Sequence, residues 1–301
     1  MQMSDYHDPV LLDECLEGLL IKPKGIYVDV TFGGGGHSKG IMSKLKDGHL
    51  YAFDQDDDAL MNEFDDDRCT LINANFRYLK NSLRFHRIKE VDGILADLGV
   101  SSYQFNIPDR GFSIRFESKL DMRMDKNSEL SAVKVLNQYK EEDLKHILKN
   151  YGEVKRPGTL ARIICEQRMK KPIEKVSELI NLLKPFAPKM RENKFFAKVF
   201  QAIRIEVNDE LNALCEMLVQ AQDILKPGGR LVIISYHSLE DRLVKNFINK
   251  GNFEGDLKQD FYGNKLLRFK KISRKPLLPD KNEIQKNNRA RTAKLRVAEK
   301  L

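Results

Sequence analysis

Four consecutive glycines, Gly33–Gly36, lie between a β-branched apolar run, Ile26–Val30, and a helical segment that begins at Ser38. Glycines let a ligand approach the backbone closely, and the N-terminus of the following helix offers free N–H groups. Asp54 ends the next apolar run, where a carboxylate commonly accepts hydrogen bonds from a ribose. The glycines do not match the dinucleotide pattern G-x-G-x-x-G, which favours a nucleoside ligand without pyrophosphate, such as S-adenosylmethionine. The alternative is a glycine-rich turn that binds nothing.

A second carboxylate, Asp97, closes the apolar run Val91–Ala96 and precedes a turn that contains Ser101 and Ser102. Open α/β sheets bind ligands at the carboxyl ends of their strands. We therefore expect Asp97 to face both a cofactor and an acceptor amine. The alternative is a carboxylate that only caps the turn.

His237 and Ser238 follow another apolar run, Leu231–Ser235, and suggest a hydrolase at first sight. The chain has no G-x-S-x-G elbow, and adjacent strand residues point to opposite faces, so a catalytic triad is not expected. A structural alternative makes Ser238 the N-cap of a helix, with Asp241 in its first turn near the positive end of the dipole. The six histidines are dispersed without a His-Glu-x-x-His pattern, so no metal site is expected.

Three arginine-rich segments, 109–115, 120–125 and 287–296, offer side chains suited to phosphate. The planar guanidinium group makes bidentate phosphate contacts, and the Phe residues nearby can stack on bases. In the first two segments, pairing with neighbouring aspartates is an equal alternative. The net charge of the last segment favours nucleic acid, and the residues predicted to bind it are Arg110, Arg115, Arg123, Arg242, Arg289, Arg291 and Lys294.

The net charge of the chain is concentrated near its C-terminal end. Residues 251–301 hold 14 Lys or Arg and 6 Asp or Glu, which accounts for the whole formal charge of +8. A basic flank on a neutral body suggests a polyanionic partner, although a solvated lysine-rich surface explains the same excess.

Composition restricts the class of protein further. With 41% hydrophobic and 32% charged residues, the chain is expected to be globular, and no apolar run reaches the ~18 residues of a membrane helix. The four cysteines show no Cys-x-x-Cys spacing and the first residues show no secretory pattern. These features predict a cytoplasmic protein.

The elements that must position these residues alternate between strands and helices in the first third of the chain. Such alternation predicts βαβ units on a parallel sheet. The predicted strands are 26–30, 50–53, 70–72 and 91–96, and the predicted helices between them are 38–45 and 76–85.

From 131 to 187 the apolar period is helical throughout, with Pro157 opening one helix. A long helix over 195–225 then leads into a strand at 231–235, and two further strands at 266–272 and 293–298 are expected at the sheet edge. This order favours a helical insertion within one α/β domain. We predict a discontinuous α/β domain, 1–112 and 195–301, and a helical insertion, 113–194, that recognises the substrate.

Together, these segments resemble the RsmH/MraW family of ribosomal RNA small subunit methyltransferases. The similarity covers nearly the whole chain, in the blocks 7–14, 31–38, 97–102, 110–113, 120–124, 200–205, 237–242 and 289–296. It implies an α/β, class I S-adenosylmethionine-dependent methyltransferase fold, Rossmann-like with a mostly parallel sheet and a helical insertion. Position by position, it implies cofactor contacts from Gly35, Gly36, His37, Asp54, Phe76, Asp97 and Gln104.

The activity that this resemblance implies is methylation of the N4 amine of one cytidine in the decoding region of bacterial 16S rRNA. Direct displacement at an activated methyl group needs mainly alignment, which can supply roughly 7–11 kcal/mol. Acceptors for the amine N–H groups would localise its lone pair, and the candidates are Asp97, Ser101 and Ser102, with His237 a weaker one. The target must be unpaired or flipped out.

The chain departs from the family at a few positions. Tyr103 and Tyr236 stand where the family often has Pro and Phe, and Pro and Ser are common near Asn288 and Thr292. The expected partner is 16S rRNA within the small ribosomal subunit, with no membrane and with a homodimer as one option.

Three other functions remain as alternatives. An NAD-linked oxidoreductase is disfavoured by the glycine spacing. An assembly protein with an inactive site is disfavoured by the intact Gly35, Gly36, Asp54 and Asp97. A DNA amino-methyltransferase shares the chemistry, but the Pro-Pro-aromatic turn usual in that class does not follow Asp97.

Overall fold

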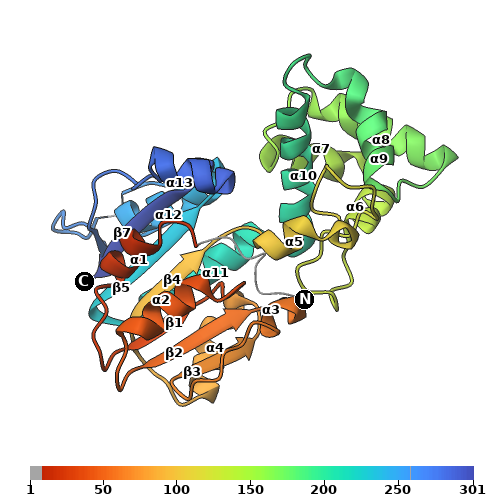
Figure 1. The fold of residues 1–301 in the computed structure, drawn as a ribbon. Helices are drawn as coiled ribbons and strands as arrows, with labels where there is room; N and C mark the ends of the chain where they lie inside the picture. The colour runs from red at the N-terminus through yellow and green to blue at the C-terminus, as the bar shows by residue number, and fades with distance from the viewer. Residues whose placement is uncertain (1–8, 258) are drawn as a thin grey trace. The chain divides into compact units, whose positions relative to one another are not determined.

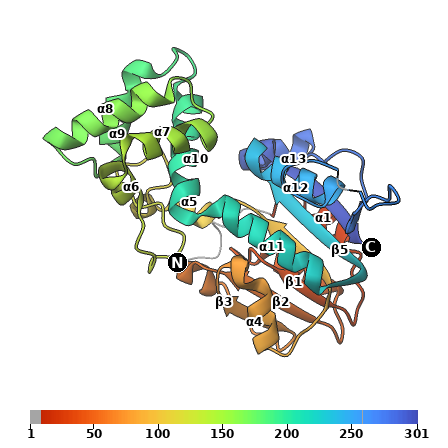
Figure 2. The same cartoon turned by 180° about the vertical axis from the view of Figure 1, so that it is seen from behind.

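The computed structural model describes residues 9–257 and 259–301. The chain divides into two compact units (Figures 1 and 2). Unit 1 combines the residues up to Gly99 with Leu211–Leu301, and unit 2 is Val100–Glu210. The insertion predicted from the sequence is 113–194, and its role in substrate recognition stays a prediction.

Unit 1 is built on a seven-stranded sheet of order β3-β2-β1-β4-β5-β7-β6. The first five strands in this order are parallel, and β7 is antiparallel to both of its neighbours. This confirms the predicted mostly parallel sheet. The strands are β1 (Ile26–Asp29), β2 (His49–Asp54), β3 (Cys69–Asn73), β4 (Val91–Asp97), β5 (Leu225–Ser235), β6 (Phe269–Lys271) and β7 (Lys294–Lys300).

The two last strands were both expected at the sheet edge, and this is wrong for β7. β7 lies between β5 and β6, so of these two strands only β6 is an edge strand. Charged side chains are tolerated on β7 because they are paired. Arg296 and Lys294 bind Asp241 at 2.7 and 3.1 Å, and Glu299 lies 2.9 Å from Arg230.

Helices cover both faces of the sheet because successive strand residues point to opposite sides. On β5, Leu231 and Ile233 pack in the cluster formed with α4, α11 and α12, whereas Val232 and Ile234 pack with α1 and α2. Figures 1 and 2 show these two helical layers from opposite sides. The helices of unit 1 are α1 (Leu12–Leu19), α2 (Gly36–Lys44), α3 (Asp57–Leu60), η2 (Phe76–Tyr78), α4 (Leu79–Phe85), α11 (Glu210–Ile224), α12 (Ser238–Lys250), α13 (Lys281–Lys286) and η5 (Asn288–Thr292).

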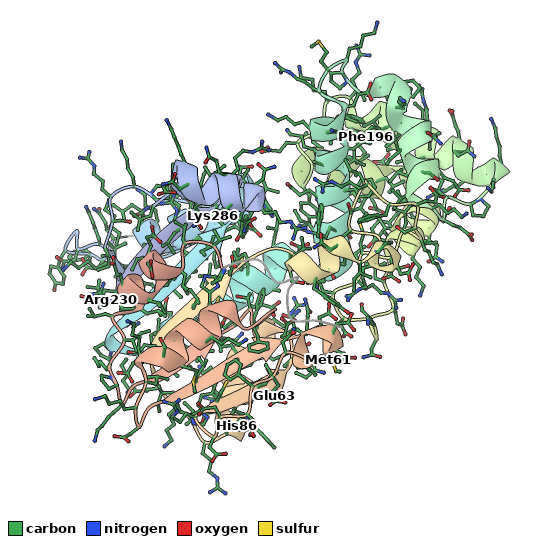
Figure 3. The ribbon with its side chains drawn as sticks, viewed as in Figure 1. Met61, Glu63, His86, Phe196, Arg230 and Lys286 are labelled. Carbon is green, nitrogen blue, oxygen red and sulfur yellow. The ribbon has the colours of Figure 1, made fainter. Side chains whose placement is uncertain are left out.

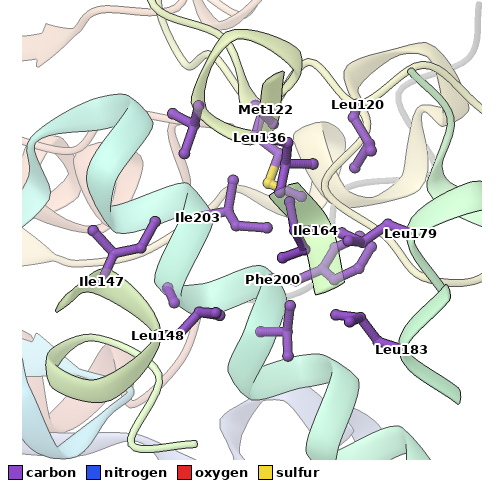
Figure 4. Close-up of a cluster of buried hydrophobic side chains, with 14 of the residues drawn as sticks. Leu120, Met122, Leu136, Ile147, Leu148, Ile164, Leu179, Leu183, Phe200 and Ile203 are labelled. Carbon is purple, nitrogen blue, oxygen red and sulfur yellow. The ribbon is translucent and has the colours of Figure 1, made fainter. Parts of the chain in front are cut away.

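Unit 2 is helical, as the apolar period predicted. Its helices surround a buried apolar cluster that includes Leu136, Ile164 and Phe200 (Figure 4), and Phe196 of the same cluster is labelled in Figure 3. Pro157 is the first residue of a helix, which confirms that prediction. The helices are α5 (Ser102–Asn106), η3 (Pro108–Arg110), α6 (Ala132–Gln138), α7 (Glu141–Asn150), α8 (Pro157–Lys170), α9 (Val176–Leu183), η4 (Lys184–Phe186) and α10 (Glu192–Asn208).

The single helix predicted over 195–225 is wrong, because the chain breaks between α10 and α11. Asp209 takes a left-handed conformation, with φ 49°. The side chain of Asn208 binds a loop of the same unit, donating to Met122 O at 2.8 Å and accepting from Met124 N–H at 2.7 Å. The helix therefore ends where its last side chain is committed to that loop. Among the described residues, no helix combines the length and apolar character of a transmembrane span.

Candidate active site

Asp54 fixes the glycine loop between β1 and α2. Its Oδ2 accepts the Gly33 N–H at 2.8 Å and its Oδ1 accepts the Asp56 N–H at 2.9 Å. Gly33 and Gly35 have φ of 52° and 73°, a left-handed backbone that favours glycine. Burial raises the pKa of Asp54 to about 6, although the two N–H bonds oppose this. The acid predicted to hold a ribose thus also shapes the loop beside it.

Asp29, the last residue of β1, is a buried carboxylate that the sequence analysis did not select. It accepts hydrogen bonds from Ser38 Oγ at 2.7 Å and from the Thr31 N–H at 3.1 Å. Thr31 Oγ1 in turn accepts the Asp97 N–H at 2.7 Å. Asp29 therefore ties the start of α2 to the end of β4. The sequence feature that could have identified Asp29 is an acid inside the apolar run that precedes the glycine loop.

Asp97 lies between His37 and Tyr236. Tyr236 donates its phenol proton to Asp97 Oδ1 at 2.7 Å, and His37 Nδ1 lies 3.7 Å from Asp97 Oδ2. His37 Nε2 is 2.9 Å from the Val10 carbonyl oxygen. Because a carbonyl only accepts, Nε2 carries a proton, and Nδ1 is the atom that faces the carboxylate. Both oxygens of Asp97 thus have a defined neighbour.

The carboxyl ends of three neighbouring parallel strands therefore each carry an acid, namely Asp29, Asp54 and Asp97. Burial is the main cause that raises the pKa of all three. A cationic ligand would relieve the repulsion among these carboxylates, of which Asp29 is buried and Asp54 and Asp97 are partly exposed.

The arrangement fits S-adenosylmethionine, which carries a sulfonium and an ammonium charge. Gly35 is the N-cap of α2 and no side chain caps that helix, so its first N–H groups suit the carboxylate of the ligand. Phe76 follows β3 in η2 and packs partly buried against the core. The predicted cofactor residues of unit 1 share the carboxyl edge of the sheet: Gly35, Gly36, His37, Asp54, Phe76 and Asp97.

Gln104 and Ser101 belong to unit 2 and bind each other. Ser101 Oγ accepts the Gln104 N–H, and Gln104 Oε1 accepts the Ser101 N–H, both at 3.1 Å. This capping box begins α5, of which Ser102 is the first residue. Cofactor binding by Gln104 and amine contacts from the two serines stay predictions.

His237, and not Ser238, is the N-cap of α12, which corrects the structural alternative. Glu240, which the sequence analysis did not select, is buried and accepts the N–H groups of Tyr236 at 2.9 Å and His237 at 3.3 Å. His237 Nδ1 lies 3.4 Å from the Glu240 nitrogen. A capping box therefore holds His237, and its catalytic role stays a prediction. Asp241 does lie in the first turn, where it binds Lys294 and Arg296.

Two of the predicted RNA-binding arginines bind within unit 2. Arg110 is buried and donates to the carbonyls of Arg123 and Met124 at 2.9 and 3.1 Å. Arg123 pairs with Asp121 through two bonds of 2.8 Å, which is the intramolecular alternative stated above. These contacts give both arginines a structural role.

The other predicted RNA-binding residues differ in exposure. Arg115, Arg242 and Arg291 are exposed. Arg289 is half-buried, and Lys294 pairs with Asp241. The structure thus separates three exposed cations from those that help to hold the fold together, and RNA contacts from any of them stay predictions.

The sheet order with an antiparallel β7, the glycine loop after β1 and the acid ending β2 define a class I methyltransferase, whose cofactor is S-adenosylmethionine. The chain belongs to the MraW methylase family, whose model matches residues 4–301.

Two relatives show how close this similarity is. "Ribosomal RNA small subunit methyltransferase H" of Christiangramia forsetii is 58% identical over 302 residues, covering 100% of both chains. The protein of the same name from Flavobacterium johnsoniae is 57% identical, covering 99% of this chain and 98% of the relative.

Proposed function

We propose that this methyltransferase transfers a methyl group from S-adenosylmethionine to the N4 amine of a cytidine in the decoding region of bacterial 16S rRNA, in the cytoplasm. The names of its relatives support a small subunit rRNA substrate. The observation that carries the proposal is the position of Asp97, a carboxylate at the carboxyl edge of the sheet, beside the glycine loop.

The bound cofactor supplies a methyl group that its sulfonium already activates. Asp97 accepts an N–H of the target amine, which localises the nitrogen lone pair and stabilises the positive charge that develops there. Tyr236 holds one oxygen of this carboxylate, and His37 faces the other. These contacts fix the orientation of the Asp97 carboxylate. The carboxylate in turn orients the target amine, and this alignment is the main requirement of an in-line displacement.

The cysteines support direct displacement over a route through a covalent thiolate adduct of the base. Burial raises the pKa of all four thiols, to about 12 for Cys69 and about 11 for Cys215. At neutral pH these groups are protonated and are weak nucleophiles. An exocyclic amine, which needs no such adduct, is therefore favoured over a ring carbon as the acceptor.

The target cytidine has to leave any base pair to reach Asp97. We assign the grip on the surrounding RNA to unit 2 and to the basic C-terminal segment. Among the residues predicted to bind RNA, Arg115, Arg242 and Arg291 have the exposure that suits contacts with phosphate.

Transfer of labelled methyl groups tests the proposed function. The acceptors are purified small subunits that lack the modification, free 16S rRNA, and DNA, followed by nucleoside analysis. We expect N4-methylcytidine in the ribosomal RNA alone. Label in DNA, or at another atom of the base, would contradict the proposal. Cofactor binding without transfer to any acceptor would favour an assembly protein.

Asp97→Asn tests the role of the carboxylate, with Asp92→Asn as a matched control. Both acids lie on β4, but Asp92 is near its other end and binds Lys226 at 2.7 Å and the Ile26 N–H at 3.0 Å. We expect Asp97→Asn to lower kcat by about a hundredfold or more, as loss of a transition-state acceptor does. A normal turnover with only weaker cofactor binding would show that Asp97 does not take part in the methyl transfer.

A further inference from the structure

Two neighbouring aromatic side chains stand in solvent on the segment between α12 and β6. Phe261 is 97% exposed and Tyr262 is 86% exposed, with ring centroids 5.6 Å apart. Asp260 Oδ1 accepts the N–H groups of Tyr262 at 2.9 Å and Asn264 at 2.8 Å, and its Oδ2 accepts Asn264 Nδ2 at 2.9 Å. These bonds define a turn, Asp260–Asn264, that we call the aromatic tip.

The segment that carries the aromatic tip is anchored at both ends. Phe253 stacks on Phe247 with centroids 5.1 Å apart, and its carbonyl accepts Asn246 Nδ2 at 2.9 Å. At the other end, the Leu301 N–H donates to Arg268 O at 3.0 Å. Phe253 thus packs into unit 1, whereas Leu257 and Leu266 of the same segment are 37% and 52% exposed.

The sequence that includes and follows the aromatic tip, residues 259–275, is strongly basic. Residues 259–275 contain one acid, Asp260, which is committed to the turn. In the part of the chain that the structure describes, their six cations are exposed and none pairs with a carboxylate: Lys265, Arg268, Lys270, Lys271, Arg274 and Lys275. Exposed aromatic rings among unpaired cations are the combination that binds single-stranded nucleic acid, by stacking on bases and contacting phosphates.

The end of this segment that leads into β6 lies near the amino ends of the parallel strands, whereas Asp97 lies at their carboxyl ends. On β7, Leu295 is the partner of Ile234, which also pairs with Asp97, and Lys300 is the partner of Phe269. These positions are five residues apart, about 17 Å of strand. Figure 3 labels one residue toward each end of the parallel strands. Arg230 on β5 lies toward their amino ends, and Met61 follows α3 on the side of their carboxyl ends.

We propose that the aromatic tip binds an unpaired segment of RNA by base stacking, at a second site apart from the methylated nucleotide. The identity of that RNA as the ribosomal substrate rests on the proposed function. The positive charge of residues 259–275 favours RNA over an apolar protein partner. The tip then contributes to substrate affinity and not to the chemistry at Asp97.

Fluorescence of Phe261→Trp tests stacking directly, because the chain contains no tryptophan. Phe85→Trp is the matched control, since Phe85 is 85% exposed on α4 of the same unit. We expect a short single-stranded RNA to quench Trp at 261, and the matched RNA duplex to quench it much less. Trp at 85 should change little with either. No quenching at 261, or equal quenching at both positions, would overturn the proposal.

Kinetics of Phe261→Ser/Tyr262→Ser give the second readout, with Phe85→Ser as control. We expect KM for small subunits to rise at least about tenfold, since the loss of one stacked base alone lowers affinity by about this much, with kcat much less affected. A rise for subunits but not for protein-free 16S rRNA would assign the tip to a ribosomal protein and contradict RNA stacking. The quenching measurement does not need methyl transfer, so failure of the proposed function is distinguishable from failure of the tip.

Discussion

Tyr236 donates a hydrogen bond of 2.7 Å to Asp97 Oδ1 and thereby connects the ends of two neighbouring strands. Asp97 is the last residue of β4, and Tyr236 directly follows β5. Burial raises the pKa of Asp97, whereas His37 and the phenol of Tyr236 lower it. The phenol thus favours the ionised carboxylate and holds it in one orientation.

Tyr236→Phe removes this hydrogen bond and keeps the ring. We expect kcat for methyl transfer to fall about tenfold, because a bond to a charged group contributes roughly 1.5–3 kcal/mol. Without the donor, the pKa of Asp97 rises, so the acid limb of the pH–rate profile moves to higher pH. The measurement is kcat against pH with saturating S-adenosylmethionine.

Tyr139→Phe is the matched control for this variant. Tyr139 also donates to a carboxylate at 2.7 Å, to Glu206 Oε1, but in unit 2. We expect the pH–rate profile of the control to keep its acid limb. If both variants shift it equally, the effect of Tyr236 is a general loss of stability and not an action on Asp97.

The strands and the positions of their acids were predictable because they are local features. Apolar runs at 26–30 and 91–96 report burial on a parallel sheet, and Asp54 and Asp97 mark where such runs stop. Pro157 likewise starts a helix for reasons that concern its own backbone.

Features set by distant contacts were not predictable from local pattern. The break at Asp209 accompanies the binding of Asn208 to residues 122–124. β7 pairs with β5 and β6 on its two sides, and two of its charged side chains pair with the distant Asp241. Arg110 has the same sequence pattern as an RNA-binding arginine, and only the surrounding carbonyls show that it is internal.

Cofactor affinity should fall as the pH falls through the pKa of Asp54, about 6. Its ionised form attracts a cationic ligand and accepts hydrogen bonds, whereas the protonated form is neutral. For one group with this pKa, affinity for S-adenosylmethionine should weaken about tenfold between pH 7 and pH 5. Titration calorimetry measures this change.

Asp54→Asn supplies the comparison for the pH titration. Its affinity should be lower at pH 7 and should depend much less on pH over the same range. A native protein whose affinity is constant between pH 7 and pH 5 would show that Asp54 does not contribute its charge to binding.

Gly111→Ala should destabilise unit 2 through a backbone clash. Gly111 has φ 69°, and a Cβ there would meet Lys119 O and lie 2.7 Å from Asp121 N. Gly228→Ala is the control, since Gly228 has φ 76° with nothing within 4 Å of the added carbon. The control should cost about 1–2 kcal/mol in the free energy of unfolding. Gly111→Ala should cost more than about 3 kcal/mol, because the backbone must also move. Equal losses in urea unfolding would mean that the φ angle alone sets the cost.

The exposed and internal arginines should differ in how their loss affects RNA binding. Arg242→Ala and Arg291→Ala remove exposed cations and should each lower the slope of log affinity against log salt by about 1, with little change in unfolding. Arg110→Ala leaves the carbonyls of Arg123 and Met124 without their donor, so it should lower the free energy of unfolding by about 1–3 kcal/mol. Its salt slope should stay close to that of the native chain, because a buried guanidinium does not release counterions from phosphate.

Titrations with 16S rRNA at several salt concentrations measure the slopes. A reduced slope for Arg110→Ala, with unchanged unfolding, would instead place that arginine at the RNA surface.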